Sequence, residues 1–288
     1  MLTLKEYNTK LSRLKSTRKL TRTMRMISAN KLHKAQDAQK RAVEYAKPLE
    51  RMAGVVSDSE LARHPLSEVR GRVKQVVILV ITSDRGLCGA FNNNLNRQVA
   101  QWIGTQSGGH EHIRLSFCGK RGLVYFKNRG NVLKHYEGIM ARANFTATVK
   151  VSKELQEMFL AGKCDEVHIA YNVFKNVMQR TPVIEKLLPL NISAGTEGHG
   201  AKKAAPILEP DQAELWSSMV PQLVDLRLYT ALLNSMLSEH SARMISMESA
   251  TNNTEKLIDR YTILRNQARQ AAITSELSEI VAGAEALK

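Results

Sequence analysis

Residues 222–282 read QLVDLRLYTALLNSMLSEHSARMISMESATNNTEKLIDRYTILRNQARQAAITSELSEIVA, and they contain no glycine or proline; residues 1–47, at the other end of the chain, contain none either. As continuous helices rising 1.5 Å per residue, the two stretches would reach roughly 90 and 70 Å. A compact globule of 288 residues is only about 50 Å across. The sequence therefore predicts two helices that are too long to lie inside a globule.

Helices of this length are usually membrane spans, helical repeats or coiled coils. A membrane span needs about 20 nearly uncharged residues, and charged side chains such as Arg227, Glu239 and Asp259 interrupt every apolar run. No self-similarity at a period of 20 to 50 residues is present. A coiled coil is the remaining prediction, with a long amphipathic helix lying on its own domain as the open alternative.

The C-terminal stretch has apolar residues at the alternating spacing of four and three that makes helices wind around each other. Nine of the thirteen positions in this stripe are apolar: Met219, Leu223, Leu226, Thr230, Leu233, Leu237, His240, Met244, Met247, Thr251, Thr254, Ile258 and Tyr261.

The N-terminal stretch begins with the same spacing at Leu4, Tyr7, Leu11 and Leu14. We expect its stripe to shift phase after that, to Leu20, Met24 and Ile27, and to continue through Leu32, Ala35, Ala38 and Ala42. If the two helices pair antiparallel, the last residues of the chain have no partner within it.

The formal net charge of +15 is unevenly distributed. Residues 1–47 hold thirteen lysines and arginines against three acids, whereas residues 211–288 hold seven against ten. Such a basic helix indicates an acidic partner, and nucleic acid, an anionic membrane and an acidic protein segment all remain open from charge alone.

Cysteine and histidine usage gives no sign of a metal site or a disulfide framework. Cys88, Cys118 and Cys164 are isolated and odd in number, as expected of reduced thiols in a cytosol-like compartment. The eight histidines form no metal-binding pattern. The chain starts without a secretory apolar region, and we interpret its arginine-rich beginning as part of the working protein rather than a transit peptide.

Between the two helices, short runs rich in β-branched residues alternate with helical patterns, which is typical of an α/β layer with a mostly parallel sheet. Strands are predicted at 76–81, 112–118, 131–136 and 166–173, with an edge strand at 182–190, and helices at 92–103, 120–128 and 147–161.

The predicted organisation has four parts. An N-terminal coiled-coil helix occupies residues 1–60 and an α/β domain residues 73–192. A mobile loop rich in glycine and proline follows at 193–210, before a C-terminal coiled-coil helix at 211–288.

The segment TSDRGLCGAFN, residues 82–92, lies between a predicted strand and a predicted helix, where open α/β sheets often bind ligands. A phosphate-binding loop would need GxGxxG or GxxxxGK[ST], and neither is present. Cys88 next to Arg85 could be an activated thiol, but the sequence places no histidine or acid to serve it. We interpret the segment as a structural turn, and predict no catalytic residue, cofactor or metal.

Three blocks in the right order resemble the gamma subunit of the F-type ATP synthases, over nearly the whole chain. The first block includes Thr17, Lys19, Thr21, Met24, Met26, Ala29, Lys31, Ala35 and Gln36, and the second is SDRGLCG at 83–89 with Asn92. The third is in the last helix, at Ser238, Glu239, Ala242, Arg243, Met244, Met247, Ala250, Thr251 and Asn253, and again at 269–284.

The resemblance implies a specific fold and a mechanical role. The fold is an antiparallel coiled coil of the N- and C-terminal helices with an inserted Rossmann-like α/β domain. The chain would be a non-catalytic rotor shaft that couples ion flow to ATP synthesis or hydrolysis. Its implied partners are the alpha3-beta3 hexamer, an epsilon-type subunit and the membrane rotor c-ring, but no nucleic acid. Its implied location is peripheral, on the cytoplasmic side of the cell membrane.

The resemblance also assigns residues. Arg269, Gln270, Thr274 and Glu276 match positions where the family's shaft touches beta loops, and Met24 matches one close to an acidic beta segment. We hypothesise that the face of Arg18, Arg22 and Arg25 meets that segment. The most recognisable family loop comprises Ser83, Asp84, Arg85, Gly86, Cys88 and Gly89.

Several residues depart from the family pattern. Thr23 and Arg25 stand where alanine and an acid are usual, Glu248 and Ser249 replace a more basic or apolar pair, and Thr254 replaces alanine. The chain lacks a cysteine pair at 193–210, so thiol regulation of the plastid kind is not expected.

Two rival functions are weighed against the shaft. A basic coiled coil that binds nucleic acid would leave the mild acidity of the last helix unexplained. A small α/β enzyme with helical arms would need a cluster of titratable residues in a pocket, and the sequence does not offer one.

Overall fold

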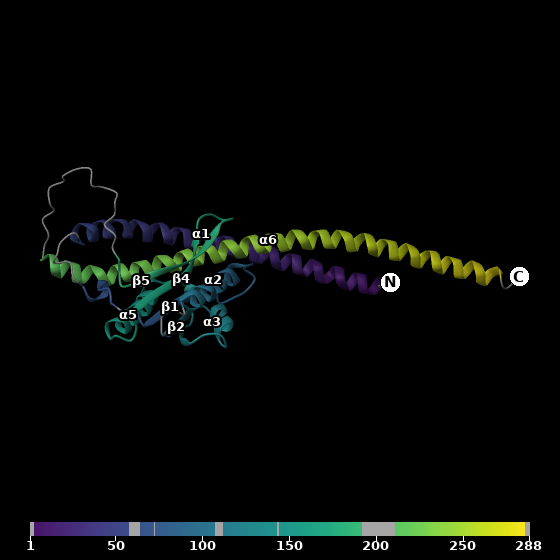
Figure 1. Cartoon of the computed structure of the whole chain (residues 1–288). Coiled ribbons are helices and arrows are strands. Elements are labelled where there is room, and N and C mark those ends of the chain that lie inside the picture. Colours follow the sequence, from purple (N-terminus) through teal and green to yellow (C-terminus); the bar gives the residue numbers. More distant parts are fainter. Residues whose placement is uncertain are drawn as a thin grey trace. The chain divides into compact units, whose positions relative to one another are not determined.

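The computed structural model describes residues 3–57, 64–71, 73–106, 112–142, 144–191 and 211–285, so the expected loop at 193–210 lies outside the described residues. The chain forms two compact units. Residues 1–29 and 243–288 make one, which we call the terminal unit, and residues 30–242 make the central unit. Two helices, α1 (Leu4–Ser57) and α6 (Gln212–Glu285), each contribute to both units (Figure 1).

Both helices run through a proline, Pro48 in α1 and Pro221 in α6, and so extend beyond the stretches free of glycine and proline. A proline inside a helix costs about 3 kcal/mol because it removes one amide donor and crowds the preceding turn. Burial offsets that cost in the central unit, where Ala53 beyond the first proline and Trp216 and Met219 before the second are buried in the core. Each large side chain buried contributes about 1.5–3 kcal/mol.

The central unit contains a five-stranded sheet in the order β3-β2-β1-β4-β5. The first four strands are parallel, and β5 pairs antiparallel with β4 at the edge, as the predicted mostly parallel sheet requires. The strands are β1 (Gln75–Ile81), β2 (His112–Cys118), β3 (Val132–Tyr136), β4 (Glu166–Phe174) and β5 (Arg180–Leu188).

Helices cover both faces of this sheet. Strand β1 lies at its centre, and after Gln75 its residues are all apolar, with buried side chains on both faces of the strand. Val76, Ile78 and Val80 pack with α2 and α3, while the alternate residues belong to the core that includes α5 and α6. The covering helices are α2 (Phe91–Gln106), α3 (Lys120–Phe126) and α5 (Phe145–Leu160); the short η1 (Pro65–Ser67) and α4 (Ile139–Arg142) complete the unit.

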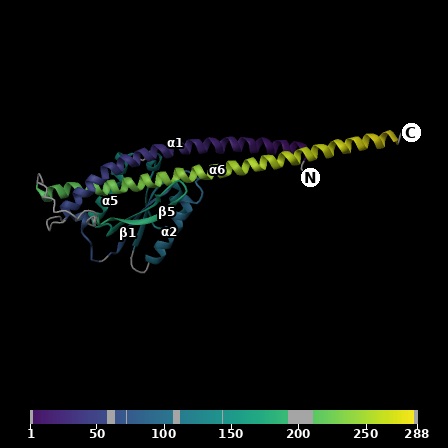
Figure 2. The same ribbon diagram turned by 90° about the horizontal axis from the view of Figure 1, so that it is seen from above.

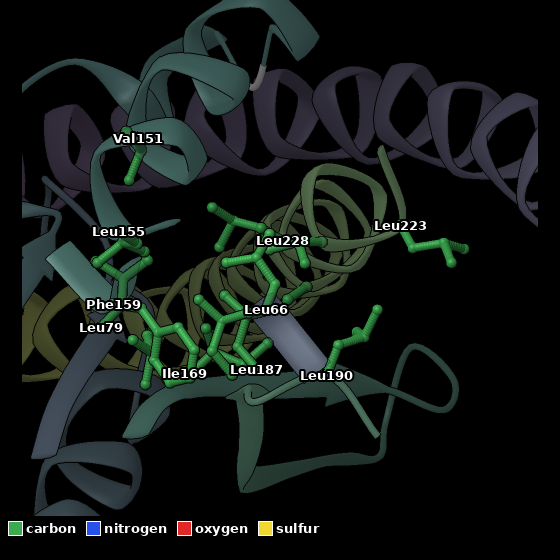
Figure 3. Close-up of a cluster of buried hydrophobic side chains, with 14 of the residues drawn as sticks. Leu66, Leu79, Val151, Leu155, Phe159, Ile169, Leu187, Leu190, Leu223 and Leu228 are labelled. Carbon is green, nitrogen blue, oxygen red and sulfur yellow. The ribbon is translucent and has the colours of Figure 1, made fainter. Parts of the chain in front are cut away.

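The larger core of the central unit joins α6 to the sheet. Figure 3 shows Leu155 and Phe159 of α5, Ile169 and Leu187 of the sheet and Leu228 of α6 converging on one cluster. Leu155, Leu187 and Leu228 are fully buried. The α6 segment of this unit also lies beside α1, where Gln39 Nε2 donates to Asn234 Oδ1 at 3.0 Å. The sheet and α5 therefore hold α6 through an extended apolar contact. Figure 2 shows this part of α6 running along the sheet.

In the terminal unit α1 and α6 pair antiparallel. The ring of Tyr7 lies 6.3 Å from that of Tyr261, and Lys10 Nζ lies 4.5 Å from the centre of the same ring. Farther along α1, Thr21 meets Thr251, so residue numbers rise on one helix as they fall on the other. Met247, Thr254 and Ile258 of the predicted α6 stripe are buried along this contact. The predicted antiparallel coiled coil is confirmed.

The predicted phase shift of the α1 stripe is wrong. Leu20 and Ile27 are 60% and 51% exposed. The original spacing instead continues without interruption, and its next positions are Arg18, Thr21, Arg25 and Ser28, each buried or half-buried. Apolar character guided the prediction, whereas the fixed heptad geometry decides which side of the helix faces its partner.

Candidate functional site

The seam between α1 and α6 is polar in the middle of the terminal unit. Arg25 Nη1 donates to Glu248 Oε1 at 3.1 Å, and Arg18 Nη1 lies 3.8 Å from Glu255 Oε1. Between these ion pairs, the hydroxyl oxygens of Thr21 and Thr251 are 2.8 Å apart. The sequence predicted no such pairing, because a contact between residues more than 200 positions apart depends on the helix register.

These contacts decide how the predicted basic face of α1 is arranged. Arg18 and Arg25 are each paired with a glutamate of α6, and their side chains are 42% and 41% exposed. Arg22 is exposed and Met24 is half-buried. The spacing of Arg18, Arg22 and Arg25 puts all three on one side of the helix. Of the three residues, Arg22 is therefore the most exposed.

Two of the departures from the family pattern meet in space. Arg25 and Glu248, two positions predicted to depart from the family pattern, form an ion pair with each other. Each unusual charge is thus compensated by the other. Thr254 is buried and donates its hydroxyl to Ala250 O at 2.7 Å, and Thr23 donates to Lys19 O at 2.9 Å.

The second group of predicted contact residues lies near the end of α6. Arg269, Gln270, Thr274 and Glu276 are all exposed. Apolar side chains on the same segment are exposed as well: Ile273 49%, Leu277 57%, Ile280 68% and Val281 57%. Their spacing of four, three and one along a helix places them on one side. The end of α6 therefore presents an apolar stripe with polar residues beside it.

The third predicted group is the loop at 83–89 in the central unit, and its side chains bind one another. Asn92 Oδ1 accepts from the Ser83 amide at 3.0 Å, and Asn92 Nδ2 donates to Ser83 Oγ at 2.8 Å and to Cys88 Sγ at 3.2 Å. Asp84 Oδ1 accepts from the Lys120 amide at 3.2 Å. Ser83 and Cys88 are buried. These polar groups bond to one another and to the Lys120 amide, and so hold the loop in shape.

The backbone of this loop explains part of its sequence. Leu87 has a φ of 64° and Gly89 one of 57°, both in the left-handed region that non-glycine residues rarely adopt. A β-carbon at Gly86 would lie 2.9 Å from Arg121 Nη2, the movable end of a side chain, so this contact alone does not require glycine. Leu87 adopts this strained conformation with its side chain 60% exposed.

The loop and the β4–β5 hairpin both pack on α6 within the central unit. Cys88 and Phe91 form a small buried cluster with Ala242. From the hairpin, Val177 O accepts from Ser241 Oγ at 2.8 Å, and Arg180 Nη1 donates to the same hydroxyl at 3.3 Å. The loop and the hairpin therefore contact neighbouring residues of α6, Ala242 and Ser241.

The chemistry of the remaining candidates is limited. Burial raises the pKa of Cys118 to about 12 and that of Cys164 to about 11, so neither thiol is ionised at neutral pH. In the described part of the chain, no three metal-binding side chains gather at one place. Among the same residues, every helix is either too short or too polar to span a bilayer.

One buried carboxylate was missed by the sequence analysis. Asp225 of α6 is 8% exposed, and its Oδ1 accepts from Gln156 Nε2 of α5 at 3.0 Å. Burial raises its pKa above the ordinary value, although hydrogen bonds from Ser152 and Gln156 act against the rise. Asp225 occupies a position of α6 among apolar core residues, including Val224 and Leu228. A single acid within this apolar run is the one signal by which the sequence could have indicated a buried carboxylate.

Comparisons with known sequences agree along the whole chain. A family model described as ATP synthase matches residues 3–287. The ATP synthase gamma chain of Anaeromyxobacter dehalogenans is 39% identical over 293 residues, and that of a Geobacter species is 36% identical over 292. Each alignment covers the full length of both chains.

Solved structures share the fold. A chain of the Euglena gracilis mitochondrial ATP synthase, in an OSCP/F1/c-ring structure, superposes with a TM-score of 0.65 and 18% identity, covering 99% of this chain and 94% of that one. A chain from the central stalk and c-ring of the Tetrahymena thermophila mitochondrial enzyme gives 0.60 and 21%, covering 80% and 99%.

Proposed function

The chain belongs to the ATP synthase family, among its gamma chains, and from this premise we propose how its residues transmit rotation. It is the central rotor shaft of an F-type ATP synthase. We infer that it carries out no bond chemistry, and that it couples ion flow through a membrane rotor to nucleotide turnover on an alpha-beta ring. The internal hydrogen bonds of the loop at 83–89 support a structural role for the chain's best-matched motif.

The proposed coupling depends on asymmetry. A single helix pair inside a ring of three equivalent catalytic subunits contacts each of them differently. A partner shifts a conformational equilibrium only by the difference in its interaction energy with the two states. Each catalytic subunit is therefore biased toward a different state, and turning the shaft exchanges those biases.

The end of α6 is the proposed bearing. Its exposed apolar stripe, which includes Ile273, Leu277 and Ile280, supports this assignment because surfaces of this kind usually contact a partner. Arg269, Gln270, Thr274 and Glu276 lie beside the stripe and are proposed to touch beta loops. A helix that rotates inside the alpha-beta ring needs contacts that are shallow. We propose that the side chains of this stripe provide such contacts and do not interlock with those of the ring.

The basic face of α1 is the second proposed contact. Residues 1–47 hold thirteen basic residues against three acids, and Arg22 is exposed between two arginines that are paired with glutamates. We propose that Arg22, together with Met24 and the half-exposed Arg18 and Arg25, meets an acidic segment of the beta subunit. The remaining proposed partners are an epsilon-type subunit and the membrane rotor c-ring, with the complex at the cytoplasmic side of the membrane.

The full-length gamma-chain match is the observation on which the proposal rests, and copurification is its test. The tagged chain, expressed at native abundance, should recover alpha and beta subunits in a ratio of one shaft to a ring of three each. Nuclease treatment and high salt should not change this yield. Recovery of nucleic acid, or of the chain alone, would contradict the shaft and favour the rival functions.

A further inference from the structure

We propose that three polar pairs across the helix seam, Arg18–Glu255, Thr21–Thr251 and Arg25–Glu248, act as a register lock that fixes how α1 and α6 are aligned in the terminal unit. The mechanical consequence of this inference rests on the proposed shaft function, whereas the lock itself is a property of the free chain. The residues of the lock are positioning residues, because they would act through the alignment of the helices.

The geometry defines a single alignment. Contacts of 3.8, 2.8 and 3.1 Å follow one another along about two turns of α1. The partners on α1 rise by three and then four residues, while those on α6 descend by four and then three. The hydroxyl pair lies between the two ion pairs, and Thr21 is only 8% exposed. A polar contact enclosed in a helix seam is the feature that specifies register in coiled coils.

Within the terminal unit, an apolar seam alone would specify the alignment poorly, because a heptad pattern presents a similar surface after a slip of seven residues, and only the contacts of the same helices in the central unit, such as Gln39 with Asn234, would oppose that slip. The lock does not present a similar surface after such a slip. A slip of one heptad in either direction would place Thr21 opposite an apolar side chain, Ile258 or Met244. It would also leave only one of the two arginines opposite a glutamate. Every slipped alignment therefore loses the hydroxyl contact and one ion pair.

The energetics favour a role in alignment over one in stability. The arginine and glutamate side chains of the two pairs are 41–52% exposed, and exposed ion pairs contribute little to stability and are screened by salt. The two threonines also reach their own helices at Arg18 O and Met247 O, at 3.1 and 2.7 Å. The two threonine hydroxyls thus take part in three contacts, one with each other and one each with a backbone oxygen of the same helix. Each hydroxyl therefore keeps a hydrogen-bond partner even if the other threonine is removed. What the lock adds is a preference among alignments.

Apolar side chains available for the seam point elsewhere. On α1, Leu20 lies within the stretch of the lock and Ile27 just beyond it, but both are more than half exposed. Arg18, Thr21 and Arg25 instead occupy the positions that face α6. A helix pair selected only for stability would have the opposite arrangement, because burying a leucine stabilises more than a half-exposed ion pair.

The lock can be tested on the full chain with spin labels at two exposed positions of the terminal unit, Asn8→Cys on α1 and Lys256→Cys on α6. The three native cysteines are buried, so the two introduced cysteines should be labelled first. A slip of one heptad moves the labels by about 10 Å along the helix axis, which double electron–electron resonance resolves. The native chain should give one narrow distance distribution.

The unlocked variant combines Thr21→Val, Thr251→Val and Arg25→Glu, which places two glutamates opposite each other. Its slipped population should rise about tenfold, since one hydrogen bond and one ion pair no longer discriminate between alignments. Adding Glu248→Arg restores one ion pair in reversed order and should return most of the narrow distribution. The control Thr17→Val with Thr262→Val removes two hydroxyls that donate to their own helices, and should change nothing.

A single narrow distribution in the unlocked variant would overturn the lock, as would equal broadening in the control. If the unlocked variant loses its helix pair, Arg25→Glu alone and its rescue by Glu248→Arg decide the question. In the assembled complex the lock predicts fewer ions pumped per ATP hydrolysed in the unlocked variant. Failure of copurification would instead refute the shaft function and leave the distance measurement valid.

Discussion

Asp225 places a carboxylate in the core of the central unit, where burial raises its pKa above the ordinary value of 3.8. A carboxyl with a raised folded-state pKa favours folding below its unfolded-state pKa, and this contribution is lost as pH rises through the folded-state value. At neutral pH the burial of this carboxyl group therefore opposes folding. Its hydrogen bond from Gln156 compensates only in part.

We expect Asp225→Asn to raise the thermal unfolding temperature at pH 7, since the amide can still accept from Gln156 without a buried charge. The gain should shrink as pH falls and vanish near about pH 3, where the native carboxyl is protonated in both states. Thermal unfolding followed by circular dichroism across this range measures it. Asp259→Asn, an exposed carboxylate on the same helix, is the control. A less stable Asp225→Asn at pH 7 would mean that hydrogen bonding outweighs burial.

Arg22 is the exposed member of the basic face, so its reversal tests the proposed contact with little effect on the helix pair. In the assembled complex, Arg22→Glu should preserve ATP hydrolysis but lower the number of ions pumped per ATP about threefold, the order expected of one exposed charge contact. Reconstituted vesicles with a pH-sensitive dye report pumping. Arg97→Glu, exposed on α2, should have no effect; unchanged pumping in both variants would exclude the contact.

Residue-level outcomes show where sequence reasoning stops. The departures at Arg25 and Glu248 were visible in the sequence, but their pairing was not, because it depends on which turn of α6 lies beside which turn of α1. Asp225 was missed for a related reason. A single acid in a long helix does not reveal whether it faces water or the core.

The strands and helices of the central unit were predicted because each has a distinct local pattern. Strand β2 matches its predicted bounds at 112–118, and the continuous apolar run of β1 identified a strand buried on both faces. Strand β5 begins two residues before the predicted edge strand, with Pro182 inside it. Proline is tolerated there because an edge strand needs only half of its backbone groups for pairing.

Helix α1 was harder to predict than α6. Its stripe is apolar only at its start, and the seam then continues through Arg18, Thr21 and Arg25 while Leu20 and Ile27 lie outside it. Hydrophobicity is a reliable guide to a seam only where the seam is apolar. The unbroken heptad spacing would have given the correct side.

The contrast between Leu11 and Leu20 tests this assignment. Leu11 is 4% exposed and Leu20 is 60% exposed on the same helix. Leu11→Ala should destabilise the helix pair of the terminal unit by about 2–3 kcal/mol through lost burial and an incompletely filled cavity, whereas Leu20→Ala should change it by less than about 0.5 kcal/mol. Chemical unfolding followed by far-UV circular dichroism compares the two. Equal losses of stability in the two variants would mean that Leu20 also faces α6, as the shifted stripe predicted.

For the molecule as a whole, net charge is the property that can be predicted most directly from the sequence. The net charge of +15 gives long-range attraction to an acidic partner, and such attraction acts on association more than on dissociation. The location of the charge, concentrated in α1, follows from the sequence as well. Which acidic surface it meets does not, because that surface belongs to another chain.

We therefore expect the association rate constant of the chain with an isolated alpha-beta ring to fall about tenfold between roughly 50 and 300 mM salt, as screening shortens the range of the attraction. The dissociation rate should change much less. Surface-immobilised rings and a salt series provide both constants. A dissociation rate that carried the entire salt effect would place the charges inside the final contact instead of in the approach to it.

The exposed apolar end of α6 also bears on how the chain is made. Ile273, Leu277 and Ile280 are 49%, 57% and 68% exposed, and nothing in the described chain shields them. Copies of the chain produced in excess of the alpha-beta ring would expose this apolar stripe of α6 to proteases and to one another. Cells should therefore keep synthesis of the shaft and of the ring in fixed proportion, and surplus shafts should be short-lived.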